Sequence, residues 1–187
     1  MVKVSGGSDE ATAIWCCCQD PCRDVDYEGS TCLTRSGIWL GHVLHTADAL
    51  ERFVAHNSAG AIATFAGTTR ERDNENIVSH LHYEAYTSLV VKQLQSICQQ
   101  IRAKWKVARI AIQHRIGDVD VGQCSVRIAV SSEHRAEALA AVEFAIDQLK
   151  ARAAIFKREH YVDRKASWKS NQNMEQSEPD ISSQEAS

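Results

Sequence analysis

The sequence predicts an α+β fold, in which helices pack on a mixed β-sheet within a single domain. Segments with the apolar pattern of strands alternate with segments that have a helical pattern, in the approximate order β-α-β-β-α-β-β-α-β. The chain has 187 residues, of which 44% are hydrophobic and 24% are charged. That composition is ordinary for one globular domain with a substantial core.

The two ends of the chain differ in composition from its body. Residues 1–36 are polar and poorly periodic and contain five of the seven cysteines, whereas residues 170–187 are acidic and contain no Lys or Arg. We expect both ends to be disordered, which leaves residues 37–169 as the folded domain. The three consecutive cysteines at 16–18 lack the paired C-x-x-C spacing of zinc sites, so no metal site is predicted.

Charge and cysteine content limit the classes of partner and compartment. The formal net charge is -3, with acidic ends and a mildly basic body. This balance favours a small anionic ligand or an acidic partner and gives no argument for nucleic acid. No apolar run approaches the ~20 residues of a membrane span, and the N-terminus has no secretory pattern. An odd number of cysteines without such a pattern favours a reducing compartment, so we expect a cytoplasmic protein without membrane attachment.

The first half of the domain has a local signal for each element. Residues 38–44 suit a short strand, and Thr46 can cap the helix that follows. Residues 60–67, GAIATFAG, form a near-continuous apolar run of strand length. Arg70 lies just beyond this strand, and the charged segment 71–76 is expected to be an exposed loop.

The second half continues the alternation. A strand is expected over 77–86, and apolar residues recur with helical spacing between 90 and 105. Residues 107–115 predict a further strand, whose His114 is assigned no catalytic role. Residues 116–122 contain two glycines and are expected to form a turn region.

The longest helical pattern follows a strand at 124–130 and has cationic side chains at both ends. Ser131 or Ser132 is expected to cap this helix. His134 and Arg135 then fall in its first turn, where free backbone N–H groups and an Arg favour an anion. The apolar stripe consists of Ala138, Leu139, Val142, Ala145, Ile146 and Leu149.

Two lysines follow this stripe. Lys150 falls in the last helical turn, and Lys157 is expected to end a short strand over 153–156. Both lysines can therefore point into one cleft and form a cationic pocket. In the alternative interpretation they complement the helix dipole and lie in water, and the first-turn Arg is solvated as well.

Several motifs, in order, resemble the large, catalytic subunit of molybdopterin synthase, in its eukaryotic forms above all. The motifs are GAIATFAGTTR, LHYEAY, HRIGDVDVGQCSVRIAVSSEHR, DQLKARAAIFKRE and a final W-K, and the resemblance spans roughly residues 41–171. It implies an α/β hammerhead fold and a homodimer. It also implies that each large subunit binds a small, ubiquitin-like sulfur-carrier subunit, giving a heterotetramer.

The resemblance further implies a sulfurtransferase of molybdenum cofactor biosynthesis. The C-terminal thiocarboxylate of the carrier would enter a pocket and convert cyclic pyranopterin monophosphate (precursor Z) into molybdopterin by two sulfur transfers. Because sulfur arrives on the partner, no cofactor or metal is expected.

The family motifs assign roles residue by residue. Lys150 and Lys157 match the two catalytic lysines, with Lys150 as general acid/base beside the thiocarboxylate. His134 and Arg135 match a pair that helps to hold the substrate and is donated across the dimer. The implied substrate contacts are Arg70, His134, Arg135, Lys150, Lys157, Arg158 and Glu159.

Two residues depart from the family pattern, and two rival functions stay open. Ala154 replaces a common Pro and Phe156 replaces the usual Trp, which could loosen the placement of Lys157. One rival is a non-catalytic scaffold that keeps the fold and the carrier-docking surface, although a scaffold has no need of Lys150 and Lys157. The other is a regulatory protein whose terminal extensions recruit further proteins.

Overall fold

A computed structural model describes residues 13–16, 36–162 and 167–170, with side chains for 36–162. In chain order the elements are β1 (Ala13–Cys16), β2 (Ser36–Gly41), α1 (Ala47–Val54), β3 (Ala61–Thr68), β4 (Arg72–Asp73), β5 (Asn76–Ala85), α2 (Thr87–Lys104), β6 (Val107–Arg115), β7 (Gly117–Asp120), β8 (Cys124–Ser132), α3 (Arg135–Arg152), β9 (Ile155–Tyr161) and β10 (Ser167–Ser170). The predicted class, helices packed on mixed strands in one domain, is confirmed.

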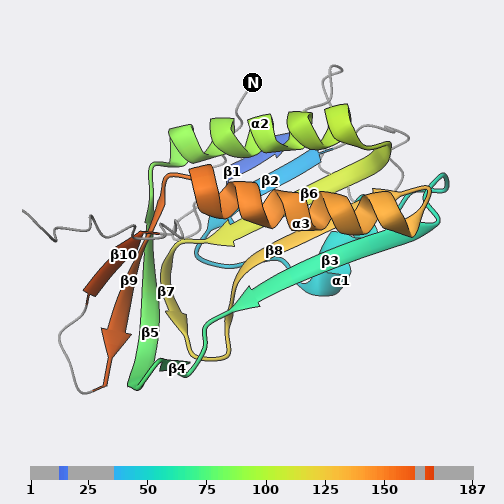
Figure 1. Cartoon of the computed structure of the whole chain (residues 1–187). Coiled ribbons are helices and arrows are strands. Elements are labelled where there is room, and N and C mark those ends of the chain that lie inside the picture. The colour runs from blue at the N-terminus through green and yellow to red at the C-terminus, as the bar shows by residue number, and fades with distance from the viewer. Residues whose placement is uncertain (1–12, 17–35, 163–166, 171–187) are drawn as a thin grey trace, which may run out of the picture.

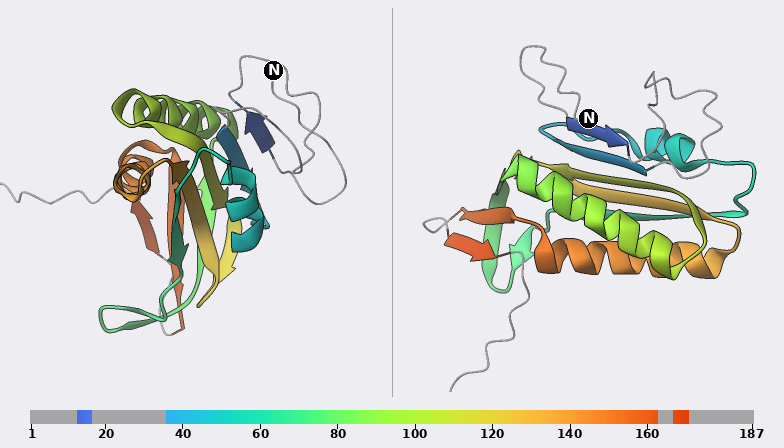
Figure 2. Two further views of the ribbon diagram at one scale, coloured as in Figure 1. Left: turned by 90° about the vertical axis from the view of Figure 1, so that its right-hand side faces the viewer. Right: turned by 90° about the horizontal axis from the view of Figure 1, so that it is seen from above.

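The larger sheet forms the centre of the molecule. Its strand order is β1-β2-β6-β8-β3, and among these described strands only β2 and β6 pair in parallel. Helices α2 and α3 lie side by side on one face, and α1 lies on the other (Figures 1 and 2). Alternation along the strands produces two cores. Ile110, Ile112 and Ile128 belong to the core under α2 and α3, whereas Ala111 and Ala129 pack with α1.

A second, smaller sheet stands at one end of the first, where α3 ends (Figure 1). Its order is β10-β9-β5-β4, and β7 pairs with β5 as well. All of these pairs are antiparallel. Strands β5 and β9 therefore expose one face toward the end of α3 and the opposite face away from it. This arrangement positions the site described below.

Helix α3 begins later than the sequence suggests. Ser131 and Ser132 belong to β8, and their hydroxyls bond to β6 and the residue before it. Ser131 Oγ accepts from the Arg109 amide at 3.1 Å, and Ser132 Oγ donates to the Lys106 carbonyl at 2.9 Å. The N-cap is His134, whose side chain makes no capping hydrogen bond. The expectation of a serine cap is therefore wrong.

The buried stripe of α3 also differs at one position. Leu139 is 60% exposed, so its expected place in the core is wrong. Ala141 is fully buried and takes part in the stripe instead. The other five predicted positions are all buried.

Three predictions for short segments are wrong, because strand pairing that the sequence pattern does not indicate extends into them. The turn region 116–122 contains strand β7. The charged segment 71–76 contains β4, which pairs with the start of β5 in a tight hairpin where Asn74 has φ 54°. The strand after α3 runs over Ile155–Tyr161, so Lys157 lies within it rather than at its end. The cap on α1 is confirmed, since the Ala49 amide donates to Thr46 Oγ1 at 3.2 Å.

Parts of both termini are ordered as strands. Ala13–Cys16 forms β1 and Ser36 begins β2, so the expected disorder over residues 1–36 does not hold for these five residues. Ser167–Ser170 forms β10, whereas residues 171–187, the cysteines at 17, 18, 22 and 32, and the Trp168 side chain lie outside the described part. Among the described helices, none is long and apolar enough to cross a membrane.

Candidate active site

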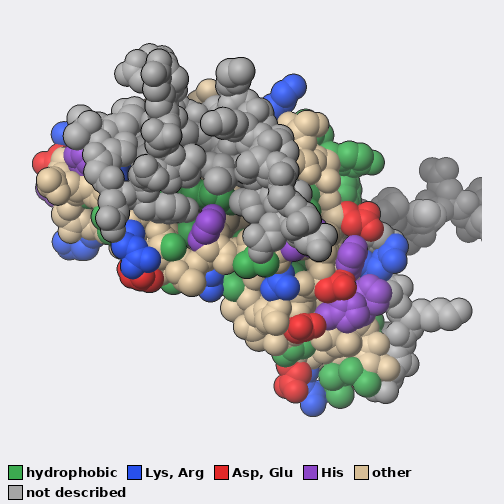
Figure 3. All heavy atoms as spheres, turned by 180° about the vertical axis from the view of Figure 1, so that it is seen from behind, with side chains coloured by type: hydrophobic (Ala, Val, Ile, Leu, Met, Phe, Trp, Pro, Cys, Tyr) green, Lys and Arg blue, Asp and Glu red, His purple; other side chains and the backbone are tan. Residues whose placement is uncertain are grey.

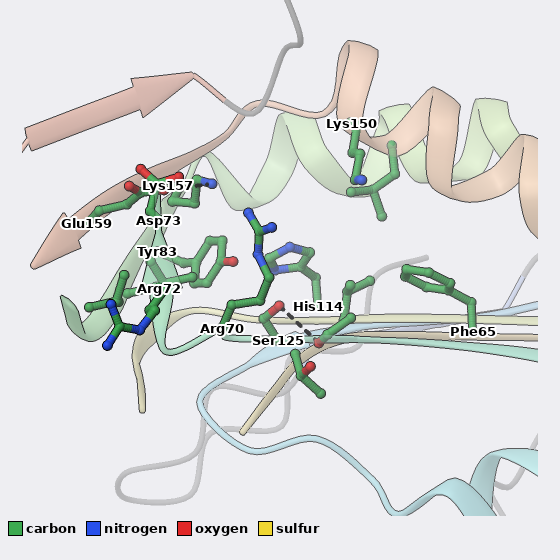
Figure 4. A pocket seen from close by; sticks show the side chains of 16 residues that line it. Phe65, Arg70, Arg72, Asp73, Tyr83, His114, Ser125, Lys150, Lys157 and Glu159 are labelled. Atoms are coloured by element: carbon green, nitrogen blue, oxygen red, sulfur yellow. Dashed lines mark hydrogen bonds and ion pairs between the residues drawn. The ribbon is translucent and has the colours of Figure 1, made fainter. Parts of the chain in front are cut away.

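A cavity of about 400 Å³ lies where the end of α3, the end of β3 and the second sheet meet (Figure 4). Its ionisable lining consists of four cationic and two acidic side chains, a formal charge of +2 with histidine neutral. These residues are Arg70, Arg72, Lys150, Lys157, Asp73 and Glu159. A cavity of this charge attracts small anions.

Lys150 projects into the cavity from the last turn of α3 (Figure 4). The neighbouring Leu149 is only 1% exposed and anchors this turn in the core. Helix α3 ends there with a bond from the Ala153 amide to the Leu149 carbonyl at 2.9 Å. Within the described residues, no acidic side chain lies within ion-pair distance of Lys150.

Lys157 enters the same cavity from β9 and is held by a carboxylate. Its Nζ lies 3.0 Å from Oε1 of Glu159, two residues further on the same face of the strand. Glu159 is 5% exposed. The hydroxyl of Tyr161 lies 2.5 Å from the other oxygen of Glu159 and 3.2 Å from Oδ2 of Asp73. These contacts fix the direction of the Lys157 side chain.

The turn that joins the two lysines is tied to α2 and β5. The Ala154 amide donates to Oε1 of Gln93 at 2.9 Å, and its carbonyl accepts from the Tyr86 amide at 3.3 Å. Phe156 points to the opposite face of the sheet, where its ring meets Tyr86 edge to face at 6.1 Å. The turn is therefore held by hydrogen bonds at Ala154, and neither Ala154 nor Phe156 lines the cavity.

Arg70 reaches the cavity from the residues just after β3. The preceding Thr69 is 3% exposed and anchored on both sides. Its amide donates to the Gln123 carbonyl at 3.0 Å, and its carbonyl accepts from the Gly122 amide at 2.9 Å. The backbone is thus fixed one residue before Arg70, and the guanidinium extends into the cavity (Figure 4).

Three of the predicted substrate contacts lie outside this cavity. His134 and Arg135 begin α3, and fifteen residues of helix put Arg135 about 22 Å from Lys150. Arg158 alternates with Lys157 and Glu159, so it lies on the outer face of the second sheet, opposite His82 in the strand register.

That outer face carries histidines and carboxylates, which gather on the projecting part of the molecule in Figure 3. The rings of His80 and His160 stack at 4.2 Å, and Nδ1 of His82 lies 2.5 Å from Asp118. This bond holds the pKa of Asp118 below its usual value. Still, no group of three or more His, Cys, Asp or Glu in the described part is placed to hold a metal ion.

The sequence argument missed a neutral, hydrogen-bonding part of the lining, formed by Tyr83, His114 and Ser125. His114 is 2% exposed, and burial lowers its pKa to about 4, although a bond to the Arg115 carbonyl opposes the shift. Burial raises the pKa of Tyr83, while a hydrogen bond with Ser125 acts the other way. The strand alternation of 107–115 gave the only available signal, and it does not distinguish a core histidine from a pocket histidine.

Comparisons with known proteins identify the family of this chain. A family model described as MoaE protein matches residues 42–152. Molybdopterin synthase catalytic subunit 1 of Aedes aegypti is 46% identical over 121 residues, which are 63% of this chain and 78% of that protein. The Bos taurus molybdopterin synthase catalytic subunit is 45% identical over 126 residues, 67% of each chain.

Solved structures show the same fold. Molybdopterin synthase from Staphylococcus aureus superposes with a TM-score of 0.64 at 33% identity, over 67% of this chain and 90% of that one. A complex of subunits 1 and 2 of molybdopterin-converting factor from Helicobacter pylori 26695 gives 0.51 at 25% identity, over 65% and 77%. Since the family model spans more than half of the sequence, the chain belongs to the MoaE family of molybdopterin synthase catalytic subunits.

Proposed function

We propose that this protein converts cyclic pyranopterin monophosphate into molybdopterin with sulfur from the thiocarboxylated tail of a small carrier subunit. The observation that carries the proposal is the meeting of Arg70, Lys150 and Lys157 in one cavity of net positive charge. The phosphate of the substrate and the thiocarboxylate are both anionic, so both are attracted there. Fixed cations also stabilise the charge that develops as sulfur attacks.

The two lysines have different surroundings and take different roles. Lys157 is bound to Glu159 and acts as a fixed positive charge that orients the anionic groups. Lys150 has no such carboxylate among the described residues, so its ammonium group can exchange protons with the substrate as general acid/base. No metal and no cofactor is required for these steps, since the carrier supplies the sulfur.

A second copy of the chain would bring His134 and Arg135 to the cavity. Strand β3 is the edge of the described sheet, and none of its residues is charged. It starts opposite Ser132, close to His134, and ends two residues before Arg70. Antiparallel pairing of two β3 strands about a two-fold axis therefore sets His134 and Arg135 of the second copy beside Arg70.

The carrier is the second partner. The Helicobacter pylori relative was solved as a complex of two subunits of molybdopterin-converting factor, which supports a heteromeric assembly for this chain too. The tail of the carrier would enter the cavity between Lys150 and Lys157. A biosynthetic enzyme whose partner carries a thiocarboxylate is expected in the cytosol. Neither rival function, scaffold or regulator, is favoured by an observation of the site.

The direct test mixes the purified chain with thiocarboxylated carrier and precursor Z and measures molybdopterin. Replacing Lys150 by Ala should lower the rate at least a hundredfold, the usual contribution of a general acid/base, and leave carrier binding intact. Arg152→Ala is the matched control, because Arg152 is another cation of the same helical turn that does not line the cavity. Near-normal conversion by Lys150→Ala would rule out the assigned role.

A further inference from the structure

The part of the cavity that carries no charge has a defined chemistry of its own. His114 comes from β6, Tyr83 from β5 and Ser125 from β8, and all three line the cavity together with the apolar Phe65 and Leu149. Because five different elements supply these groups, the fold sets their relative positions. None of the roles assigned above uses them.

A hydrogen bond to the backbone determines which ring nitrogen of His114 carries the proton and which one can accept a hydrogen bond. Nδ1 lies 2.7 Å from the carbonyl oxygen of Arg115. A carbonyl oxygen only accepts, so Nδ1 carries the proton and Nε2 of the neutral ring keeps its lone pair. Among the described residues Nε2 has no hydrogen-bond partner, and His114 is part of the cavity lining. Figure 4 shows His114 and Arg70 among the side chains that line the cavity.

We propose that His114 is a substrate contact whose Nε2 accepts a hydrogen bond from an N–H group of the heterocycle of the substrate. The inference rests on the proposed function and adds the way in which the ring end of the substrate is recognised. The edge-to-face contact of Tyr83 with His114, at 5.0 Å between ring centroids, keeps the imidazole in this orientation.

The anionic groups of the reaction, the phosphate and the thiocarboxylate, cannot occupy the position beside Nε2 of His114. A phosphate oxygen and a thiocarboxylate are acceptors, and an unprotonated Nε2 repels them. The low pKa of His114, about 4, keeps the ring in this form at neutral pH. A reduced pterin, by contrast, has N–H donors along the edge of a flat ring. Phe65 and Leu149 offer apolar surface to such a ring, while Arg70 and the lysines attract the phosphate.

Two substitutions separate the acceptor from the structural bond. The amide nitrogen of Asn occupies the place of Nδ1, so His114→Asn keeps the donor to Arg115 and removes Nε2. Gln reaches the place of Nε2, so His114→Gln offers an acceptor there. Binding of precursor Z is measured by calorimetry on the complex with a carrier that ends in an ordinary carboxylate, so that no turnover occurs. We expect His114→Asn to weaken binding roughly fivefold to tenfold, and His114→Gln to stay within about twofold of wild type.

Other outcomes decide against the proposal in distinct ways. Unchanged binding by His114→Asn overturns it, and equal losses in both variants indicate a packing role only. If wild type itself binds no precursor Z, the proposed function fails as well. If His114→Asn does not fold, the nitrogen chemical shift of His114 Nε2 in wild type decides, because the proposed bond must move this signal when precursor Z is added. A signal that stays in place overturns the contact.

Discussion

The ion pair between Lys157 and Glu159 is the most enclosed charged contact in the cavity. Glu159 is 5% exposed, and the Lys157 side chain keeps 25% of its exposure. Two charges taken partly out of water stabilise the fold only while both are present, because removing one leaves the other without compensation. The pair therefore links stability to the direction of the Lys157 side chain, which is proposed to act in the reaction.

Glu159→Gln tests this link. The shape is kept and the charge is lost, so we expect the free energy of unfolding to fall by about 1–3 kcal/mol, less than for a fully buried pair because Lys157 is partly exposed. We also expect at least a tenfold lower rate of conversion. Urea unfolding and turnover measure the two effects. Glu84→Gln, an exposed carboxylate on the outer face of the same sheet, should change neither quantity.

His114 makes stability depend on pH in a defined direction. Its pKa in the folded state, about 4, is below the ordinary 6.5, so the unfolded chain binds more protons between these values. Its contribution is complete above pH 6.5 and is lost as pH falls toward 4, about 2 kcal/mol of it between pH 7 and pH 5. Urea unfolding at both pH values should show a smaller difference for His114→Gln. An identical difference would contradict the assignment.

At the scale of elements, the turn between α3 and β9 sets the separation of the two lysines. The Ala154 amide is bound to Gln93 of α2, at a position where the family commonly has a proline without an N–H. Ala153 has ψ 130°, a value compatible with a following proline. Gln93 thus accepts a hydrogen bond from the Ala154 amide, a donor that a proline at this position would lack.

This gives a double-mutant prediction. Gln93→Leu leaves the Ala154 amide without its acceptor and should destabilise the protein by about 1 kcal/mol and reduce turnover several-fold. Adding Ala154→Pro removes the unpaired donor and should restore most of both. Gln99→Leu, on the exposed side of the same helix, is the control. A double variant no better than Gln93→Leu would show that the bond is unimportant.

The elements also show what the sequence could and could not determine. Helices α1 and α2 and strand β6 could be predicted from apolar periodicity, because each of them packs an apolar face on the core. Strands β4 and β7 were missed because they are short, contain turn-forming residues and depend on pairing with β5. Serines 131 and 132 resemble helix caps but extend β8, since β6 offers them partners.

The same limit applies to the cavity. Lys150 and Lys157 were found from their spacing and the family motifs, and both line it. Arg158 was placed with them by the family motif alone, whereas β9 continues past Lys157 and alternation turns Arg158 to the other face. His114 became visible only once burial and its bond to Arg115 were known.

At the scale of the whole molecule, His134 and Arg135 lie at one end of α3 and Lys150 at the other. One proposed site would therefore take residues from two copies of the chain. If His134 and Arg135 act across the two-fold axis, each cavity depends on Lys150 of one copy and Arg135 of the other. A dimer formed from a Lys150→Ala chain and an Arg135→Ala chain then has one intact cavity. A dimer in which both residues act within one chain has none.

Mixing the two inactive variants after unfolding and refolding distinguishes these cases. We expect about a quarter of wild-type turnover, because half of the dimers are mixed and each has one of two cavities intact. A mixture of Lys150→Ala and Lys157→Ala is the control, since both residues line the cavity of the same chain. It should recover nothing. Failure of the first mixture would show that His134 and Arg135 do not act across the two-fold axis.

Strand β1 has a further consequence for assembly. Its four residues pair antiparallel with β2 along the border of the large sheet that lies opposite β3. A sheet sealed on that side by a short outer strand offers a poor template for another chain there. Another strand can then add to the described sheet only at β3, and the pairing of two β3 strands in a symmetric dimer occupies that edge. The N-terminal strand would in this way make association stop at two copies, where an unsealed sheet could polymerise.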